Sequence, residues 1–314
     1  MSSAPWASAS RKSAKSSEPV GPGGRVRPAP FDNAPAGAYF EGGEAAMNRR
    51  AFVAGQFYPG EPERLREMIA LLTGPPAARK KAIAVVSPHA GYVYSGAVAA
   101  AVYSSTLMPG TFIILGPAHR EIASLFAIQV KGSWQTPLGS SPIDMGLASA
   151  IVERCPLVAE DEQAHLWEHS LEVQLPFIQY FGKEAAIVPI CVSHEAGYDQ
   201  LQTLGRSLAE AVRVRGRETL IVASTDMSHY VSQKTAERKD MLAIRKVLDL
   251  DPAGLYETVT KERISMCGFQ PTAAALVAAL GLGAAGAELV RYQTSGDVSG
   301  DTTQVVGYAG IRIF

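Results

Sequence analysis

The feature that most constrains the fold is a regular alternation of short apolar runs with helical segments after residue 80. Such alternation is typical of α/β proteins in which helices cover a mainly parallel sheet. We therefore predict a single-domain α/β sandwich around a mixed, largely parallel sheet. Strands are expected at 83–86, 112–115, 126–130, 186–192, 220–224, 288–294 and 304–314. Helices are expected at 95–103, 144–154, 201–212, 236–248, 252–260 and 272–282, with 168–180 partly helical.

Residues 1–46 differ from the rest of the chain. Ala, Gly, Pro and Ser make up 29 of these 46 residues, a composition that buries too little apolar surface to offset its ordering entropy. The segment lacks the continuous apolar stretch of a signal peptide. We expect either a disordered extension or a start codon assigned too early, with Met47 as the true start. The α/β domain is then expected to span 47–314.

Composition excludes several classes of protein. A formal net charge of -1 gives no reason to expect nucleic acid or an anionic membrane as partner. No apolar run reaches 18 residues, so no membrane span is expected. The three cysteines lack paired spacing and indicate reduced thiols in a cytoplasmic protein. Walker A, G-x-G-x-x-G and G-x-S-x-G patterns are also missing, which argues against nucleotide binding and serine hydrolase chemistry.

Three of the six histidines follow predicted strands inside loops of small residues. These are His89, His119 and His229. In an open α/β sheet the carboxyl ends of the strands form the functional edge. Three imidazoles delivered to one edge most simply indicate a metal site.

Two further pairs carry candidate chemistry. Asp226 lies three residues before His229, and a carboxylate at that spacing can orient an imidazole if the segment turns helically, unless it only caps a helix. His165 and His169 lie four apart and would share one face of a helix. Glu168 is adjacent to His169, which departs from the zincin pattern, so we do not infer a metalloprotease.

Cys267 lies in a Cys-Gly turn before Pro271, which is not typical of a core position. As a thiolate it can ligate a soft or borderline metal. As a nucleophile it would need a lowered pKa, and burial as an inert thiol is the third alternative. The polar loop 294–301 lacks the ligand spacing of an EF-hand, and a solvated hairpin loop is its simplest interpretation.

Six motifs together resemble the Memo family, in the prokaryotic form called AmmeMemoRadiSam system protein B. The resemblance runs from about residue 51 to 314. Its motifs are VAGQFYP at 53–59, PHAGYVYSG at 88–96, LGPAH at 115–119, EHSLEVQLP at 168–176, STDMSHY at 224–230 and TSGDVSGD at 294–301.

The resemblance implies a fold similar to the class III extradiol, LigB-type dioxygenases. It places His89, His119 and Cys267 at the metal site, where those dioxygenases have two histidines and a carboxylate. It also implies catalytic roles for His229, as acid/base, and for Asp226. His165 and His169 are expected to line the same cleft. The name of the prokaryotic branch implies association with an AMMECR1-like protein and a radical SAM protein.

Three functions follow as hypotheses. The first is a metal-dependent oxidoreductase that uses reduced iron or copper on a small organic substrate. The second is a non-catalytic module that binds a peptide or protein, with Tyr92, Tyr94, Trp167 and Tyr230 as aromatic walls. The third is a zinc-dependent hydrolase that uses the same ligands.

Overall fold

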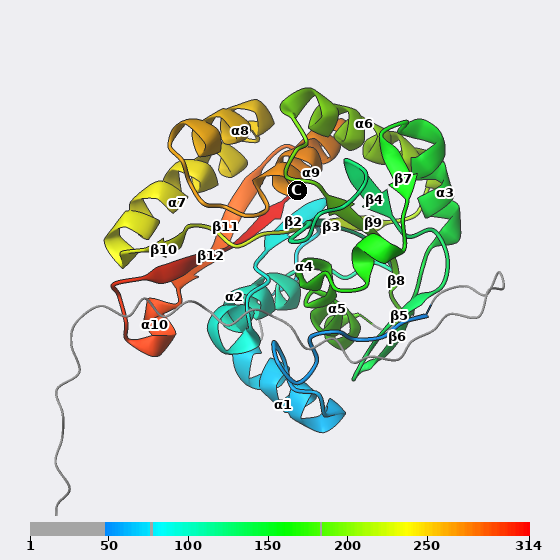
Figure 1. Ribbon diagram of the computed structural model, residues 1–314. Coiled ribbons are helices and arrows are strands. Elements are labelled where there is room, and N and C mark those ends of the chain that lie inside the picture. The colour runs from blue at the N-terminus through cyan, green and yellow to red at the C-terminus, as the bar shows by residue number, and fades with distance from the viewer. Residues whose placement is uncertain (1–47, 76–77, 183) are drawn as a thin grey trace, which may run out of the picture. The chain divides into compact units, whose positions relative to one another are not determined.

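Four parallel strands occupy the middle of the sheet at the centre of the fold (Figure 1). The computed structural model describes residues 48–75, 78–182 and 184–314, so the extension expected at 1–46 lies outside the described residues. The strands lie in the order β2 (Ala84–Ser87), β9 (Thr219–Ser224), β3 (Thr111–Pro117) and β8 (Ala186–Val192). All residues of β2 and β3 are buried. A strand buried on both faces needs apolar residues throughout, which explains the continuous apolar runs of the sequence.

The outer strands make the sheet mixed. On one side β12 (Val305–Ile313) runs antiparallel to β2, and both β10 (His229–Val231) and β11 (Ala287–Thr294) run antiparallel to β12. On the other side β4 (Phe126–Ile128) runs antiparallel to β8, with β7 (Val158–Glu160) parallel to β4. A separate small sheet contains β1 (Asn48–Arg49), β5 (Ser133–Thr136) and β6 (Gly139–Pro142).

Helices cover both faces of the large sheet (Figure 1), which confirms the predicted α/β sandwich. One face carries α1 (Pro62–Thr73), α2 (Tyr92–Ser104) and α5 (Leu175–Phe181). The other carries α3 (Met145–Arg154), α6 (Tyr198–Arg215), α7 (Gln233–Leu248), α8 (Pro252–Lys261) and α9 (Phe269–Gly281). The short helices are η1 (Gln163–His165), α4 (His169–Glu172) and α10 (Gly296–Ser299).

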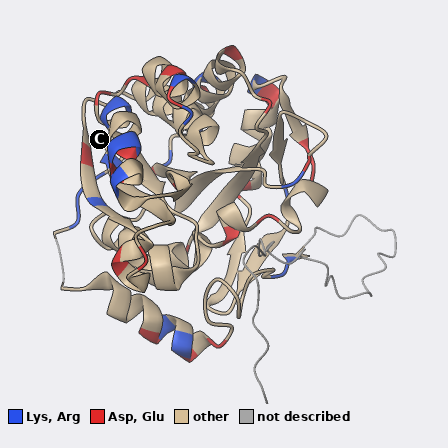
Figure 2. Cartoon of the chain, turned by 60° about the vertical axis from the view of Figure 1, so that its left-hand side comes forward, with Lys and Arg blue, Asp and Glu red and all other residues tan. Residues whose placement is uncertain are grey.

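One hydrophobic cluster includes residues from Val53 to Ile313, so the described part of the chain shares a continuous core. Lys, Arg, Asp and Glu residues occur mainly in the covering helices and the loops (Figure 2). Within the described ranges, no helix combines the length and the apolar character that crossing a bilayer requires.

Candidate metal centre

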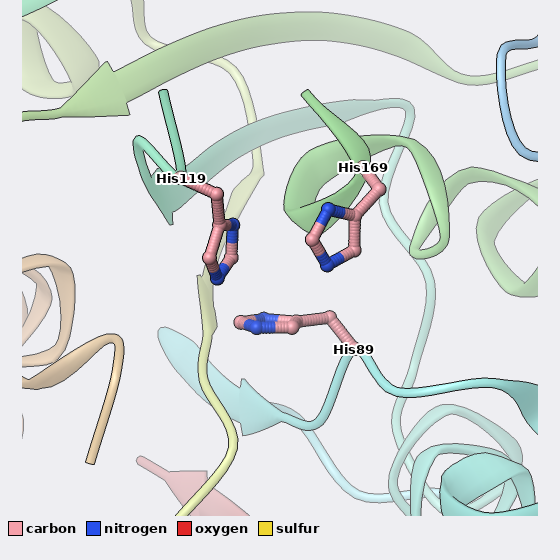
Figure 3. A group of neighbouring side chains, drawn as sticks. All are labelled: His89, His119 and His169. Atoms are coloured by element: carbon pink, nitrogen blue, oxygen red, sulfur yellow. The ribbon is translucent and has the colours of Figure 1, made fainter. Parts of the chain in front are cut away.

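Three histidines from separate segments converge at the carboxyl end of the central strands (Figure 3). His89 lies two residues beyond β2, His119 lies two residues beyond β3, and His169 begins α4. Because β2 and β3 both pair with β9, their ends lie close together at the same edge. One nitrogen from each ring lies within 4.8 Å of one nitrogen from each of the other two. The structure thus brings His89 and His119 together, as expected, and adds His169 as the third member. Cys267, the third ligand that the resemblance implied, is not in this group and lies close to His89 alone among the three rings.

His169 reaches this edge because α4 packs directly against the end of β3. A Cβ atom at Gly116 would lie 2.6 Å from Ser170 Oγ, a separation that packed side chains do not reach. Ser170 Oγ also donates a hydrogen bond to the Pro117 carbonyl at 3.0 Å. Glycine at position 116 therefore permits the close approach that places His169 beside His119.

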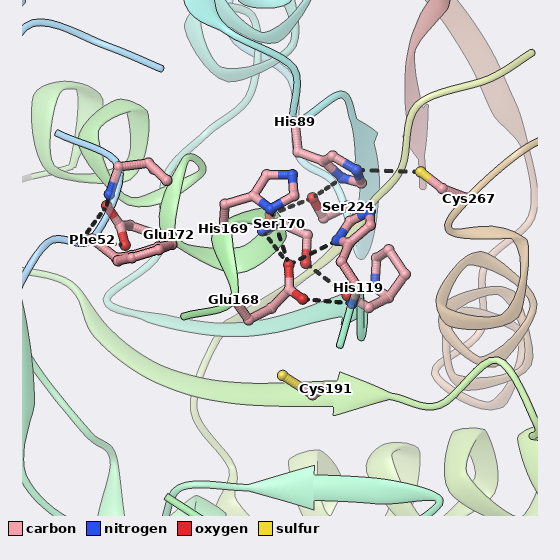
Figure 4. A network of polar contacts seen from close by, with 12 residues as sticks. Phe52, His89, His119, Glu168, His169, Ser170, Glu172, Cys191, Ser224 and Cys267 are labelled. Carbon is pink, nitrogen blue, oxygen red and sulfur yellow. Dashed lines mark hydrogen bonds and ion pairs between the residues drawn. The ribbon is translucent and has the colours of Figure 1, made fainter. Parts of the chain in front are cut away.

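Glu168 holds two of the three rings by their inner nitrogens (Figure 4). Its Oε1 accepts a hydrogen bond from His119 Nδ1 at 2.9 Å and lies 3.5 Å from His169 Nδ1. Its Oε2 accepts from the His119 backbone N–H at 2.7 Å, and Ser170 N donates to Oε1 at 2.7 Å. An imidazole that donates through Nδ1 keeps a lone pair on Nε2, which is the form that binds a metal.

The protonation state of Glu168 supports this arrangement. Burial alone would raise the pKa of the Glu168 carboxyl, but the hydrogen bond from His119 and the charges of His119 and His169 outweigh burial and lower it to about 2. The carboxylate is therefore ionised at neutral pH and accepts hydrogen bonds only. Glu168 acts here as an orienting group behind the histidines, a role that its position in the sequence does not predict.

His89 is held in the same way by a hydroxyl group. Its Nδ1 lies 3.0 Å from Ser224 Oγ, which also accepts from Gln174 Nε2 at 2.8 Å. The one Ser224 hydroxyl proton is used in a 2.6 Å hydrogen bond to the Ser170 carbonyl. His89 Nδ1 must then be the donor, and Nε2 keeps its lone pair. Burial, followed by the charges of His119 and His169, lowers the pKa of His89 well below its ordinary value, so the ring is neutral.

Cys267 lies at the free nitrogen of His89. Its Sγ is 3.2 Å from His89 Nε2 (Figure 4). The same atom is 3.3 Å from the Asp226 backbone nitrogen. The adjacent Gly268 allows this, because a Cβ atom there would lie 2.4 Å from the Ser224 carbonyl oxygen at the end of β9. Burial and the nearby Asp226 carboxylate raise the pKa of the thiol, so Cys267 is a neutral thiol rather than an activated nucleophile.

The donor set fits a transition metal. Two ligands of one tetrahedral ion, an imidazole nitrogen and a thiolate sulfur, lie about 3.5 Å apart, because each is 2.0–2.3 Å from the metal. The 3.2 Å between Cys267 Sγ and His89 Nε2 is close to this separation. Imidazole and thiolate donors suit iron, copper and zinc, and a bound metal deprotonates a coordinating thiol.

Asp226 and His229 do not form the pair that their spacing suggested. Residues 225–228 are not helical and His229 begins β10, so the two side chains do not share a helical face. Asp226 Oδ1 instead accepts from the His89 backbone N–H at 2.8 Å. His229 Nδ1 lies 2.8 Å from the carbonyl oxygen of Ser265, whose hydroxyl accepts from the His229 backbone N–H. His229 is therefore oriented by Ser265, while Asp226 positions the loop that carries His89.

His165 is not brought to the histidine cluster. It ends the turn η1, and the backbone of Glu168 is extended, with a ψ angle of 123°, so no single helix joins His165 to His169. The His165 ring is fully buried, packs against Trp134 and lies 3.4 Å from Cys191 Sγ. Burial, followed by the charge of Arg49, lowers the pKa of His165 to about 3. The expectation that His165 lines the cleft is therefore not met.

The aromatic side chains near the site divide into two groups. Tyr92 is a core residue, buried and donating its hydroxyl hydrogen bond to the Val173 carbonyl at 2.6 Å. Tyr94, Trp167 and Tyr230 are exposed to solvent. Tyr230 also adopts a φ angle of 57°, which is unusual for a bulky residue, at an irregularity in the pairing of β10 with β12. Tyr92 therefore cannot serve as the expected aromatic wall, whereas the other three remain available.

Comparison with known proteins extends these observations to a family. A family model described as Memo-like protein matches residues 49–312. A MEMO1 family protein of Methanopyrus kandleri is 44% identical over 84% of this chain and 98% of its own length. A MEMO1 family protein of Methanothermobacter thermautotrophicus is 42% identical over 84% of this chain and 99% of its own. An uncharacterized Escherichia coli K12 protein of known crystal structure aligns at a TM-score of 0.49 and 16% identity, over 72% of this chain and 98% of that one. The match to the family model and the identity to these two relatives show that the chain belongs to the Memo family.

Proposed function

We propose that this Memo-family protein binds one transition-metal ion at the carboxyl edge of its sheet and uses it as an oxidoreductase. His89, His119 and His169 would supply imidazole nitrogens, and Cys267 would supply a thiolate beside His89. The observation that carries this proposal is the convergence of three ring nitrogens that all lie within 4.8 Å of one another. Two of these rings also have Nδ1 in a short hydrogen-bonding contact. Such outer partners fix the tautomer that metal ligation requires.

The donor set favours reduced iron or copper. Thiolate and imidazole ligands together prefer softer ions than the carboxylate-containing site of the extradiol dioxygenases. Such an ion, when bound, supplies one-electron chemistry or the binding of dioxygen. His229 would serve as the proton acceptor, because its Nδ1 faces the Ser265 carbonyl and its Nε2 then carries the lone pair. The substrate would be a small organic molecule.

A binding module is the second candidate function, and the exposed aromatic residues favour it. Tyr94, Trp167 and Tyr230 leave large apolar rings in solvent, whereas most other aromatic side chains of the described residues are buried or half-buried. Aromatic side chains of this kind are enriched where proteins bind partners. A peptide or protein partner would then be held without chemical change.

Metal content distinguishes these functions. We expect about one iron or copper per chain in protein purified without oxygen, and loss of that metal in His89→Ala and His169→Ala. His229→Ala is the matched control and is expected to retain the metal, since its ring is not among the three that converge. If the Cys267→Ser variant retained the metal, Cys267 would not be one of the ligands.

The other outcomes each point to a different function. Stoichiometric zinc, lost in the same variants, would favour a zinc-dependent hydrolase, because zinc accepts these ligands and activates water. A wild-type protein that is folded and contains no metal, even after incubation with Fe²⁺, Cu⁺ and Zn²⁺, would overturn the metal centre and favour the binding module.

A further inference from the structure

A buried glutamine lies behind the hydroxyl group that holds His89. Gln174 directly precedes α5, five residues beyond His169, and its side chain is fully buried. Its Nε2 donates to two oxygens, the Pro88 carbonyl at 2.9 Å and Ser224 Oγ at 2.8 Å. One side chain therefore contacts both the backbone next to His89 and the hydroxyl group next to the His89 ring.

Two neighbours fix the orientation of the Gln174 amide. The Tyr103 hydroxyl, on α2, donates to Gln174 Oε1 at 2.9 Å. The Pro88 carbonyl can only accept, so the NH₂ end of the amide must face it. Tyr103 is itself buried and stacks on Phe177 of α5, with ring centroids 5.6 Å apart. The amide therefore presents an N–H group, and not its oxygen, to Ser224.

The three contacts of Ser224 Oγ determine where its proton lies. A hydroxyl oxygen has one proton and two lone pairs. The Ser170 carbonyl, 2.6 Å away, takes the proton because it can only accept, and the Gln174 N–H uses one lone pair. The second lone pair faces His89 Nδ1 at 3.0 Å. His89 must then donate through Nδ1, and its Nε2 keeps the lone pair that a metal requires.

The support of His89 differs in one respect from that of His119. The Glu168 carboxylate can only accept, so it fixes the His119 tautomer without help from a further residue. A serine hydroxyl can donate as well as accept. The same result at His89 therefore requires a donor that occupies the hydroxyl oxygen from another side, and Gln174 is in the position of that donor.

We propose that Gln174 is a positioning residue of the metal centre, which sets the His89 tautomer through Ser224 and fixes the His89 loop through the Pro88 carbonyl. This inference rests on the proposed metal-binding function, because the tautomer matters for a ligating ring. Without the Gln174 N–H, the Ser224 proton is free to turn from the Ser170 carbonyl to His89 Nδ1. The ring then carries its proton on Nε2, the nitrogen that would bind the metal.

The test is the substitution Gln174→Met, which nearly preserves the side-chain volume and removes both donated hydrogen bonds. The full chain is labelled with ¹⁵N-histidine and studied metal-free by NMR, with the His89 signals identified by their absence in His89→Ala. We expect a ring protonated at Nδ1 in the wild type and a clear population protonated at Nε2 in Gln174→Met. Zn²⁺ affinity, measured by competition with a chromophoric chelator, should fall about tenfold.

A second variant keeps the test decisive if Gln174→Met does not fold. Gln174→Glu preserves the volume more closely, but a carboxyl group donates at most one hydrogen bond where the amide donates two. We expect a smaller population protonated at Nε2 and a smaller loss of Zn²⁺ affinity.

Gln179→Met is the matched control, because it removes hydrogen bonds of the same kinds. Gln179 Nε2 donates to the Gly139 carbonyl at 3.2 Å and to Ser141 Oγ at 3.1 Å, and its Oε1 accepts from the Thr136 hydroxyl. These partners belong to β5 and β6 of the small sheet. Gln179→Met should keep the wild-type His89 tautomer and Zn²⁺ affinity even if it lowers the urea midpoint.

The outcomes separate this inference from the proposed function. A folded Gln174→Met or Gln174→Glu protein with the wild-type His89 tautomer overturns the role of Gln174, and so does a wild-type ring protonated at Nε2. An equal loss of Zn²⁺ affinity in Gln174→Met and Gln179→Met also contradicts it, because the loss would then reflect a general loosening of the fold. Failure of the wild type to bind Zn²⁺, Fe²⁺ or Cu⁺ overturns the proposed function instead, while the tautomer of the metal-free protein still decides whether Gln174 orients the ring.

Discussion

Replacing Glu172 with alanine is expected to lower the free energy of unfolding by about 3–5 kcal/mol, because it leaves a buried guanidinium without its counter-charge. Arg49 Nη1 lies 2.7 Å from Glu172 Oε2, and the two side chains are 1% and 0% exposed. The same carboxylate accepts hydrogen bonds from the backbone nitrogens of Phe52 and Val53 and from the Tyr58 hydroxyl. The midpoint and slope of urea unfolding measure the change.

An exposed ion pair of similar length provides the control. Lys81 Nζ lies 2.8 Å from Glu218 Oε1, with side chains 75% and 73% exposed, and Glu218→Ala should leave the unfolding midpoint unchanged. The double variant Arg49→Met/Glu172→Met should remain less stable than the wild type, because Phe52 and Val53 still lose their acceptor. A Glu172→Ala protein that unfolds at the wild-type urea concentration would contradict the prediction.

This buried pair also supports the metal centre. Arg49 Nη2 donates to the Glu168 carbonyl at 2.8 Å, and Arg49 Nε donates to the His165 carbonyl at 2.6 Å. The segment that carries Glu168 and His169 is therefore fixed from behind by a residue more than a hundred positions earlier in the chain. Loss of the pair should therefore also loosen the segment that carries Glu168 and His169.

The positions of His89 and His119 could be predicted because they depend on local sequence. Each follows an apolar run that can only be a buried strand, and strands of this kind in an α/β sheet end at a common edge. The sandwich and its largely parallel sheet follow from the same alternation of strands and helices.

The remaining members of the site depend on contacts that sequence spacing does not determine. The spacing of Asp226 and His229 indicates a shared face only in a helix, and residues 225–228 are not helical. His165 and His169 separate for the same reason. The role of Glu168 requires α4 to pack against the end of β3, a contact between residues about fifty positions apart. Tertiary packing, and not sequence spacing, determines which of these side chains reach the site.

Replacing Glu168 with glutamine is expected to weaken metal binding 10- to 100-fold, roughly the loss seen when an orienting partner of a ligating histidine is removed. Glutamine fills nearly the same volume, but its amide presents N–H groups as well as one oxygen to His119 Nδ1, His169 Nδ1 and Ser170 N. His119 then loses the ionised acceptor that keeps its proton on Nδ1. Competition with a chromophoric chelator for Zn²⁺ or Co²⁺ measures the affinity.

The control for this variant is Glu121→Gln, an exposed carboxylate two residues from His119 that should leave the affinity unchanged. Glu168→Asp retains the charge but shortens the side chain. It therefore tests whether metal affinity depends more on the charge or on the length of the side chain. If charge dominates through space, Glu168→Asp should bind metal nearly as well as the wild type. If hydrogen-bond geometry dominates, Glu168→Asp should resemble Glu168→Gln, because a shortened carboxylate cannot serve both ring nitrogens at once. Wild-type affinity in Glu168→Gln, with an unchanged urea midpoint, would show that the rings are oriented by packing alone.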